Sequence, residues 1–406
     1  MAVNDMTFEQ SATMLNALVE QATGQKPAIE VTDSGTFTTV AQTLLKTGYD
    51  PVLGALSQVL GRTIFSVRPY TQRFRGIDVD ADRWAAHVRK VNFVSSQLEN
   101  DERMAVLGNP PEVLKDNESV DMYKIKKPKV VQTNFYGGTE YQDHVTLFRD
   151  QLDMAFHNPE EFGRFTSGVI QTITDDLTQV RESEARGALI NLATSKQAAG
   201  GADVINVLQA YKDETGTSLT PANMYADGNY MSFVKWLYAF INTLTDRMAE
   251  RTTKYHTNIT GKPIKRHTPA DRMKAYMYNG VLNKIDSAVL SSVFNEEKLK
   301  MIDFESVAFW QNIDEPTKML ARPSYLKTDG TLETASADVA LDNVLGMLFD
   351  EEAVGITTKS TWMDRTPFNS AGGYSNLYWH HRQQVWNDFS ENCVVLIAAT
   401  PTRSGS

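Results

Sequence analysis

Cysteine is almost absent from this chain of 406 residues, which contains only Cys393. One thiol cannot form an internal disulfide, so the chain fits a reducing compartment or one that is indifferent to redox state. Cys393 precedes Val394, Val395 and Leu396. A small residue in such an apolar run is expected to be buried in the core.

Long apolar runs are missing as well. No stretch of 18 apolar residues occurs, so no membrane span is predicted. The first 21 residues carry acids in place of a basic region, and their apolar residues are spaced, so no signal peptide is predicted there. The formal net charge is −10. This charge disfavours a surface that wraps nucleic acid, because phosphate binding gathers Lys and Arg on one face.

Sequence motifs of catalysis and cofactor binding are not found. The seven histidines form no HExxH or HxxxH pair, and neither GxGxxG nor GxSxG occurs. Gly261-Lys262 is not a phosphate loop, because His256 and Pro263 replace the glycine and the hydroxyl residue that the motif needs. No catalytic, cofactor-binding or metal-binding residue is therefore predicted. The 50 acidic residues leave one enzymatic alternative, a hydrolase with paired carboxylates.

The densest basic run of this acidic chain is a candidate assembly contact. It consists of Lys124, Lys126, Lys127 and Lys129, within strand-like alternation that continues to a glycine pair at residues 137–138. One interpretation is a solvated edge that discourages unwanted sheet pairing. The other is a charged hairpin that reaches across to an acidic neighbour.

A long helix is the strongest structural signal. Asn158 can cap it, Pro159 suits its first position, and acids at 160–161 complement its dipole. Apolar residues at steps of three and four continue the stripe to Leu192. Glycines weaken the helix at three points where a bend is expected. These are Gly163, Gly168 and Gly187.

Shorter elements are expected on both sides of this helix. Three short helices near the N-terminus suggest an arm that docks on something else, because each is too short to be stable alone. The expected helices cover residues 7–22, 36–46, 51–60, 80–94, 204–214 and 231–251, with a further helix or two over 269–299. Strands are expected over 63–70 and, as a buried closing strand, over 392–400.

Several stretches resemble the major capsid proteins of tailed bacteriophages and prophages. They occupy residues 40–70, 121–156, 256–278, 348–355 and 366–397, and include KKPKVVQTNFYGG, HTNITGKPIKRHTP, LFDEEAVG and TPFNSAGGYSNLYWHHRQQ. Their order along the chain is that of the family, and together they cover most of it. The resemblance implies an α+β protein with the Hong Kong 97-like capsid fold, which has a long spine helix.

The resemblance also implies a division of the chain into five parts. These are an N-terminal arm (1–62), an extended β-hairpin loop region with an insertion (63–145), a peripheral domain with the spine helix (146–200), a mostly axial domain (201–375) and a return to the peripheral domain (376–406).

The implied function is structural and not enzymatic. Such a chain would assemble into pentamers and hexamers of an icosahedral shell that encloses double-stranded DNA, with weak non-specific contact to the DNA. The first 35 residues are too short for a removable scaffolding segment, so a separate scaffolding protein or none is expected. Portal and decoration proteins are further expected partners, with no membrane. The expected location is the virion, after assembly in the bacterial host cytoplasm. An encapsulin-like nanocompartment shell is the structural alternative.

Overall fold

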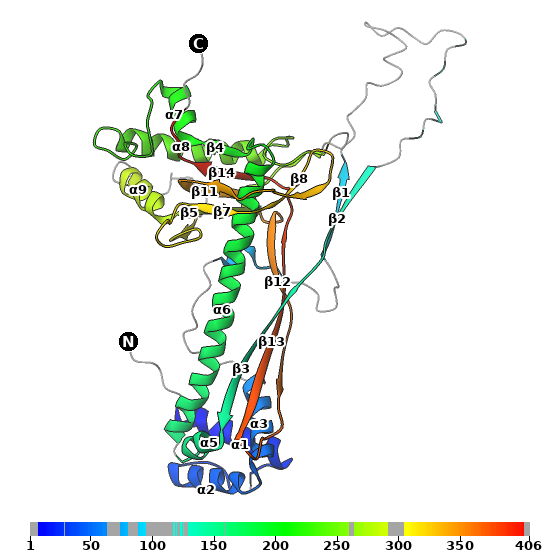
Figure 1. Ribbon diagram of the computed structural model, residues 1–406, viewed down its shortest axis with the longest axis vertical. Coiled ribbons are helices and arrows are strands. Elements are labelled where there is room, and N and C mark those ends of the chain that lie inside the picture. The colour runs from blue at the N-terminus through cyan, green and yellow to red at the C-terminus, as the bar shows by residue number, and fades with distance from the viewer. Residues whose placement is uncertain are drawn as a thin grey trace. The chain divides into compact units, whose positions relative to one another are not determined.

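The protein is a mixed structure of helices and strands, shown in the computed structural model of Figure 1. The structure describes residues 7–27, 29–62, 74–79, 88–94, 117, 119, 122–123, 125, 129–157, 159–259, 264–290 and 304–401. The strand expected over 63–70 and the cap expected at Asn158 lie outside these residues. Within them, no helix is long and apolar enough to span a membrane.

The chain forms two compact units. One comprises Met1–Ala85, Gly137–Arg186 and Ile356–Val385; the other comprises Ala86–Tyr136, Gly187–Gly355 and Trp386–Ser406. We call them unit 1 and unit 2. The five-part division expected from the family is finer than this and stays a prediction.

Three N-terminal helices form one end of unit 1 (Figure 1). They are α1 (Phe8–Thr23), α2 (Ser34–Leu45) and α3 (Tyr49–Arg62), close to the predicted ranges. Thr7 and Gln10 form a capping box at the start of α1, and Gly24 ends it with a left-handed φ of 72°. The helix expected over 51–60 extends two residues further at each end, because α3 begins at Tyr49 and ends at Arg62.

These three helices share a hydrophobic core with the rest of unit 1. Leu15, Leu18 and Phe37 are fully buried there, together with Phe162 at the start of the long helix. The ring of Phe162 lies 5.9 Å from that of Phe37 and 5.1 Å from that of Phe156. A short helix, α5 (Arg149–Ala155), contributes Leu152 to the same core. Tertiary packing thus stabilises helices that would be marginal alone.

A three-stranded sheet completes unit 1. Its order is β12 (Val354–Arg365), β13 (Tyr374–Asn387) and β3 (Thr139–Phe148). β13 and β3 pair antiparallel from Tyr374–Phe148 to Gln383–Thr139. Leu147 and Leu377 on one face join the core that the helices share. A 3-10 helix, η1 (Arg75–Ile77), precedes a bridge from Asp78 to Ile356 of β12.

The long helix is confirmed and extends further than expected. α6 (Pro159–Ala198) has 40 residues and is continuous through all three of its glycines. It ends before Gly200 and Gly201, whose positive φ values of 114° and 70° an L side chain rarely adopts. Residues up to Arg186 belong to unit 1 and the later ones to unit 2. The predicted bends at the glycines stay predictions.

A five-stranded mixed sheet is the centre of unit 2. Its order is β4 (Val204–Asn206), β14 (Cys393–Ile397), β11 (Val344–Asp350), β5 (Met273–Tyr278) and β6 (Glu305–Val307). The two inner pairs are antiparallel, and the edge strands β4 and β6 pair parallel with their neighbours. Every residue of β11 is buried.

Three helices share an apolar core with this sheet. They are α7 (Val207–Thr215), α8 (Tyr230–Ala249) and α9 (Asn279–Leu290). α8 confirms the aromatic helix predicted over 231–251, with Phe233 and Leu237 fully buried. The helix expected over 204–214 begins three residues late, because Val204–Asn206 is strand β4.

Short elements connect the larger ones in the rest of unit 2. They are η2 (Ala270–Arg272), β7 (Met319–Ala321), β8 (Ser324–Leu326), β9 (Leu332–Thr334) and β10 (Val339–Leu341). β7 pairs with β10, and β8 pairs with β9.

The helix predicted over 80–94 is wrong for the described part. Val88–Val94 is strand β1, which pairs antiparallel with β2 (Lys129–Phe135). The sequence VRKVNFV is rich in β-branched and aromatic residues, and its partner KVVQTNF has the same character. Residues 88–94 therefore form a strand because they pair with a distant strand, although the local spacing of their apolar residues also allows a helix. Trp84 and His87 lie outside the described residues.

Cys393 is buried as expected, and its burial should make the protein less stable as the pH rises above about 9. Burial raises the pKa of its thiol to about 12, from the ordinary value of 9.0. Above pH 9 the unfolded chain therefore loses a proton that the folded chain keeps, and the free energy of unfolding falls by about 1.4 kcal/mol per pH unit from this group. Urea denaturation at pH 8.5 to 10.5 should show a shallower decline for Cys393→Ala. Equal slopes for the two proteins would contradict the prediction.

Candidate assembly site

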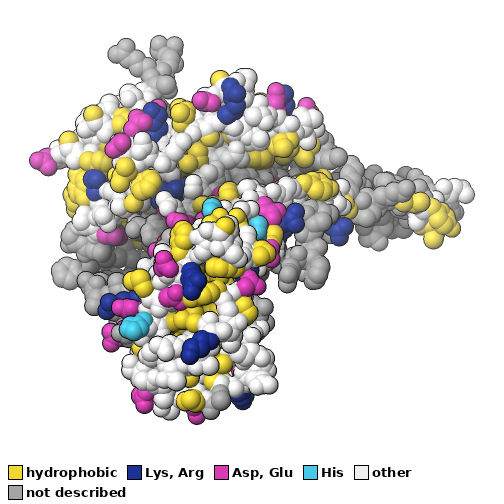
Figure 2. Space-filling view, turned by 60° about the horizontal axis from the view of Figure 1, so that its bottom comes forward, with side chains coloured by type: hydrophobic (Ala, Val, Ile, Leu, Met, Phe, Trp, Pro, Cys, Tyr) yellow, Lys and Arg dark blue, Asp and Glu magenta, His cyan; other side chains and the backbone are white. Residues whose placement is uncertain are grey.

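The β1–β2 ribbon carries the candidate assembly residues. The two strands pair from Val88–Phe135 to Val94–Lys129, and residues 95–128 connect them. Large apolar side chains of the ribbon and of the described part of its connection are exposed, and three of these are more than three-quarters exposed. They are Met122 (81%), Tyr123 (80%), Ile125 (83%), Val91 (46%) and Val130 (47%). Figure 2 shows hydrophobic side chains at the surface of this connection.

The four predicted lysines belong to this segment. Lys129 is the first residue of β2, opposite Val94. The other three, Lys124, Lys126 and Lys127, lie outside the described residues, as does the side chain of Lys129. Their role as assembly contacts stays a prediction.

A buried ionic cluster holds the ribbon within unit 2. Nζ of Lys90 in β1 lies 2.9 Å from Oε2 of Glu352 and 3.1 Å from Oδ2 of Asp388, and it donates to Oε1 of Glu391. Nη2 of Arg266 lies 2.9 Å from the same oxygen of Glu391. We call these five residues the Lys90 cluster.

Hydrogen bonds of Arg266 extend the cluster to Asn92 of β1 and to Ser390. Nη1 of Arg266 donates to Oδ1 of Asn92, two residues after Lys90, over 3.1 Å. Nε of Arg266 donates to the carbonyl oxygen of Ser390, also over 3.1 Å. Arg266 therefore connects β1 to the turn between β13 and β14. That turn supplies Asp388 and Glu391, and Glu352 comes from the turn after β11.

Burial and charge together set the protonation of this cluster. The side chains of Lys90, Asp388 and Glu391 are 15%, 3% and 5% exposed. Burial lowers the pKa of Lys90, but the charges of Asp388 and Glu391 outweigh burial, so its pKa is raised and the ammonium stays charged. Burial and the charge of Asp388 raise the pKa of Glu391 more than Lys90 and Arg266 lower it. A buried cation that three carboxylates share is costly to remove.

Aromatic packing supports the ribbon beside the cluster. The ring of Phe135, the last residue of β2, lies 6.2 Å from that of Trp386. Gly355 leaves the room that Trp386 occupies, because a Cβ at this position would lie 2.2 Å from Cζ2 of the indole. The arrangement fixes a projecting strand pair. Among the described residues, no group of acids, histidines or cysteine could hold a metal ion.

Sequence reasoning missed the Lys90 cluster. Lys90 and Glu391 are 301 positions apart, and no local motif marks either residue. The signal that could have been followed is chemical: Lys90 interrupts a strand-like segment, and NDFSEN at 387–392 concentrates acids just before an apolar strand. Spacing alone does not show that the two segments meet.

Comparison with known proteins identifies the family. The fold is similar to the capsid structure of Staphylococcus phage Andhra, with a TM-score of 0.53, 10% identity, and coverage of 83% of this chain and 87% of that one. It is also similar to a structure of the head fibre and inner core protein gp22 of native bacteriophage P68, with a TM-score of 0.52, 9% identity and the same coverage. No curated protein sequence matches the chain. The family model "Phi29-like phage major capsid protein" matches residues 15–397, nearly the whole chain. The chain therefore belongs to the Phi29-like phage major capsid protein family.

Proposed function

We propose that this capsid protein assembles into pentamers and hexamers of an icosahedral shell that encloses double-stranded DNA. The observation that carries the proposal is the β1–β2 ribbon, which exposes apolar side chains and is fixed in its own subunit by the Lys90 cluster. An exposed apolar surface on a rigid support is suited to contacts between copies. Several weak contacts per subunit add up to a stable container.

The proposal includes the Hong Kong 97-like arrangement of the chain. In it, α6 is the spine helix, the ribbon and its connection are the extended loop, and α1 to α3 correspond to the arm. β11 and β14 fall in different parts of the expected division, but they pair in one sheet. We therefore place residues 386–401 with the axial part, and residues 356–385 with the spine helix, in agreement with the two compact units.

The proposal also covers partners and location. The protein acts in the virion, after assembly in the bacterial host cytoplasm, without enzymatic activity. A separate scaffolding protein, a portal and decoration proteins are its further partners. The acidic balance of the chain suits a container in which packaged DNA moves without tight binding. The family match favours this role over an encapsulin-like shell or a hydrolase.

Reversal of the basic run tests the proposed contact. The triple variant Lys126→Glu, Lys127→Glu, Lys129→Glu should keep the circular dichroism spectrum of the parent, because the change lies in or beside an exposed ribbon. Its yield of shells, counted by negative-stain electron microscopy, should fall at least about tenfold, because like charges at a contact repel.

The charge-matched control is a variant in which three exposed lysines elsewhere in unit 2 are changed to Glu together. They are Lys235, Lys254 and Lys265. This control should still form shells. Normal shells from the ribbon variant would instead identify the basic run as a solvated edge. A parent protein that forms neither shells nor capsomers, with or without a scaffolding partner, would overturn the proposed function.

A further inference from the structure

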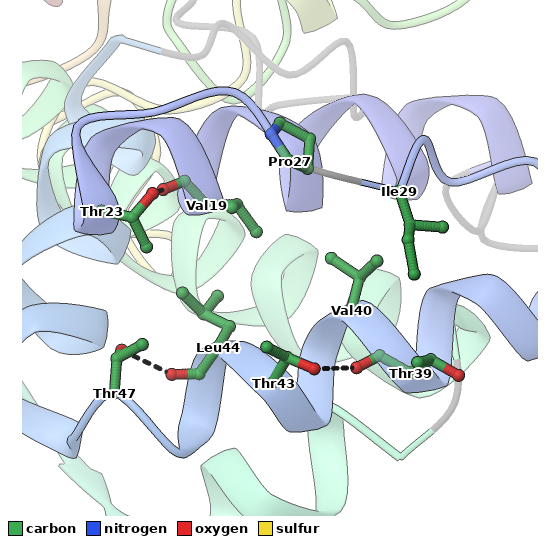
Figure 3. Close-up of a pocket in the computed structure, with 9 residues that line it drawn as sticks. All are labelled: Val19, Thr23, Pro27, Ile29, Thr39, Val40, Thr43, Leu44 and Thr47. Atoms are coloured by element: carbon green, nitrogen blue, oxygen red, sulfur yellow. Dashed lines mark hydrogen bonds between the residues drawn. The ribbon is translucent and has the colours of Figure 1, made fainter.

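An apolar pocket lies between the first two helices of unit 1. Val19 and Thr23 near the end of α1 form one wall, and residues of α2 form the other (Figure 3). Ile29, in the connection between the helices, is half exposed beside it. The cavity has a volume of about 110 Å³. A dry apolar cavity of roughly 150 Å³ can bind benzene, so this one is of a size for a single aliphatic side chain.

Threonines make this pocket apolar although they carry hydroxyl groups. The Oγ1 atoms of Thr39, Thr43 and Thr47 donate to the carbonyl oxygens of Gly35, Thr39 and Leu44, over 2.9, 2.8 and 2.6 Å. Oγ1 of Thr23 donates to Val19 over 2.7 Å. These four hydroxyl protons are already used within the protein's own backbone. The threonines therefore offer no free hydroxyl proton to a guest, which favours an apolar guest over one that needs a hydrogen-bond donor.

Exposed apolar side chains that could enter such a pocket lie on the connection between β1 and β2. Met122, Tyr123 and Ile125 are each at least 80% exposed. Tyr123 is disfavoured as the guest, because its phenol group is polar at the tip, whereas a pocket of this lining favours a wholly apolar side chain. Ile125 is compact, aliphatic and the most exposed of the three.

The connection of the ribbon and the helical end of unit 1 also carry opposite net charges. Residues 122–129 contain four lysines and no acid. The helical end of unit 1, residues 7–62 and 149–164, contains nine acidic and five basic residues. Opposite net charges on two surfaces guide their encounter and fix the register of the contact. An apolar side chain between two lysines is thus suited to a pocket in acidic surroundings.

We propose that the pocket between α1 and α2 of one copy receives Ile125 of a second copy. The inference rests on the proposed assembly into shells and names the surface that receives the connection of the ribbon. The apolar contact buries a side chain that the separate subunit exposes to water, and the lysines beside it face the acidic helical end. The threonine methyl groups define which side chain fits.

Paired cysteines test this contact. Cys393 is fully buried, so the parent provides a background with no exposed thiol among the described residues. Shells of Thr43→Cys, Ile125→Cys should form disulfide-linked dimers and higher multimers under mild oxidation, seen on a non-reducing gel. The control Gln42→Cys, Ile125→Cys places the thiol on the neighbouring exposed residue, outside the pocket. It should form at least about tenfold fewer links, because two cysteines whose Cβ atoms point apart cannot form a disulfide without backbone movement.

A second pair of variants tests the pocket without cysteine. Thr43→Phe should fill the cavity and abolish shells while leaving the circular dichroism spectrum unchanged. Thr43→Val keeps the methyl group and replaces the hydroxyl group by a second methyl of similar size, so it should assemble like the parent. Loss of assembly in both variants would point to a disturbed α2 and overturn the pocket as the receiving site.

The outcomes separate this inference from the proposed function. Shells without cross-links from the Thr43→Cys pair, with both thiols reactive after unfolding, would overturn the inference and leave the shell role intact. Equal links from both cysteine pairs, or links from the pocket thiol to another protein in the particle, would also overturn it. A parent that forms no shells would overturn both.

Discussion

Lys90→Met is expected to lower the free energy of unfolding by about 3–5 kcal/mol, because it leaves buried carboxylates without their shared cation. Asp388 and Glu391 are almost fully buried, and among the described residues Arg266 would remain as the ion-pair partner of Glu391. Methionine retains most of the aliphatic stem, so the loss reports on charge more than on packing. Urea denaturation followed by circular dichroism measures the effect.

Two comparisons make this result specific. Lys254→Met, at an exposed lysine of the same unit, should change stability by less than about 0.5 kcal/mol. The double variant Lys90→Met, Glu391→Gln should recover part of the loss, because it removes one of the unpaired charges. Equal stability of the Lys90 and Lys254 variants would show that the cluster does not hold the ribbon.

Phe162→Ala should lower the free energy of unfolding by about 3–5 kcal/mol, because it opens a cavity in the core of unit 1. Phe162 is fully buried and packs against Phe37 of α2 and Phe156 after α5. Hydrogen exchange should rise most in α1 to α3, whose helices need this core to be stable.

Phe8→Ala is the matched control, because Phe8 belongs to the same helices but is 38% exposed. It should cost less than about 1 kcal/mol, in keeping with a substitution away from the core. A Phe162 variant as stable as the Phe8 variant, with unchanged exchange in α1 to α3, would show that these helices do not depend on the start of α6.

Local sequence signals were sufficient for most of the helices, although α5 was not among those expected. Thr7, Gly24 and Pro159 mark helix ends by chemistry that acts over one turn, and the structure has helix ends at or beside each of them. The apolar run at 392–400 likewise predicted the buried strand β14. Such signals depend only on neighbours in the chain, so one sequence contains them completely.

Elements that depend on distant partners were harder to predict. α9 is a helix within the range 269–299, as expected, but β5 occupies an earlier part of that range. MKAYMY becomes a strand through its pairing with β11, some 70 positions later. The segment 88–94 follows the same rule. The Lys90 cluster is the extreme case, because its charges come from four separate segments and only the fold brings them together.

The place of β14 in its sheet has a consequence for the order of folding. Residues 393–397 lie between β4 and β11, so the central sheet of unit 2 has a gap until they have been synthesised. When the two strands of the ribbon have been synthesised, the nascent chain still lacks β14, which lies inside this sheet. It also lacks Asp388 and Glu391, which belong to the cluster that fixes the ribbon. Pairings across such long sequence separations form late. We therefore expect a subunit to become competent for assembly only when nearly all of its chain has been made, so that a prematurely terminated subunit would not enter a shell.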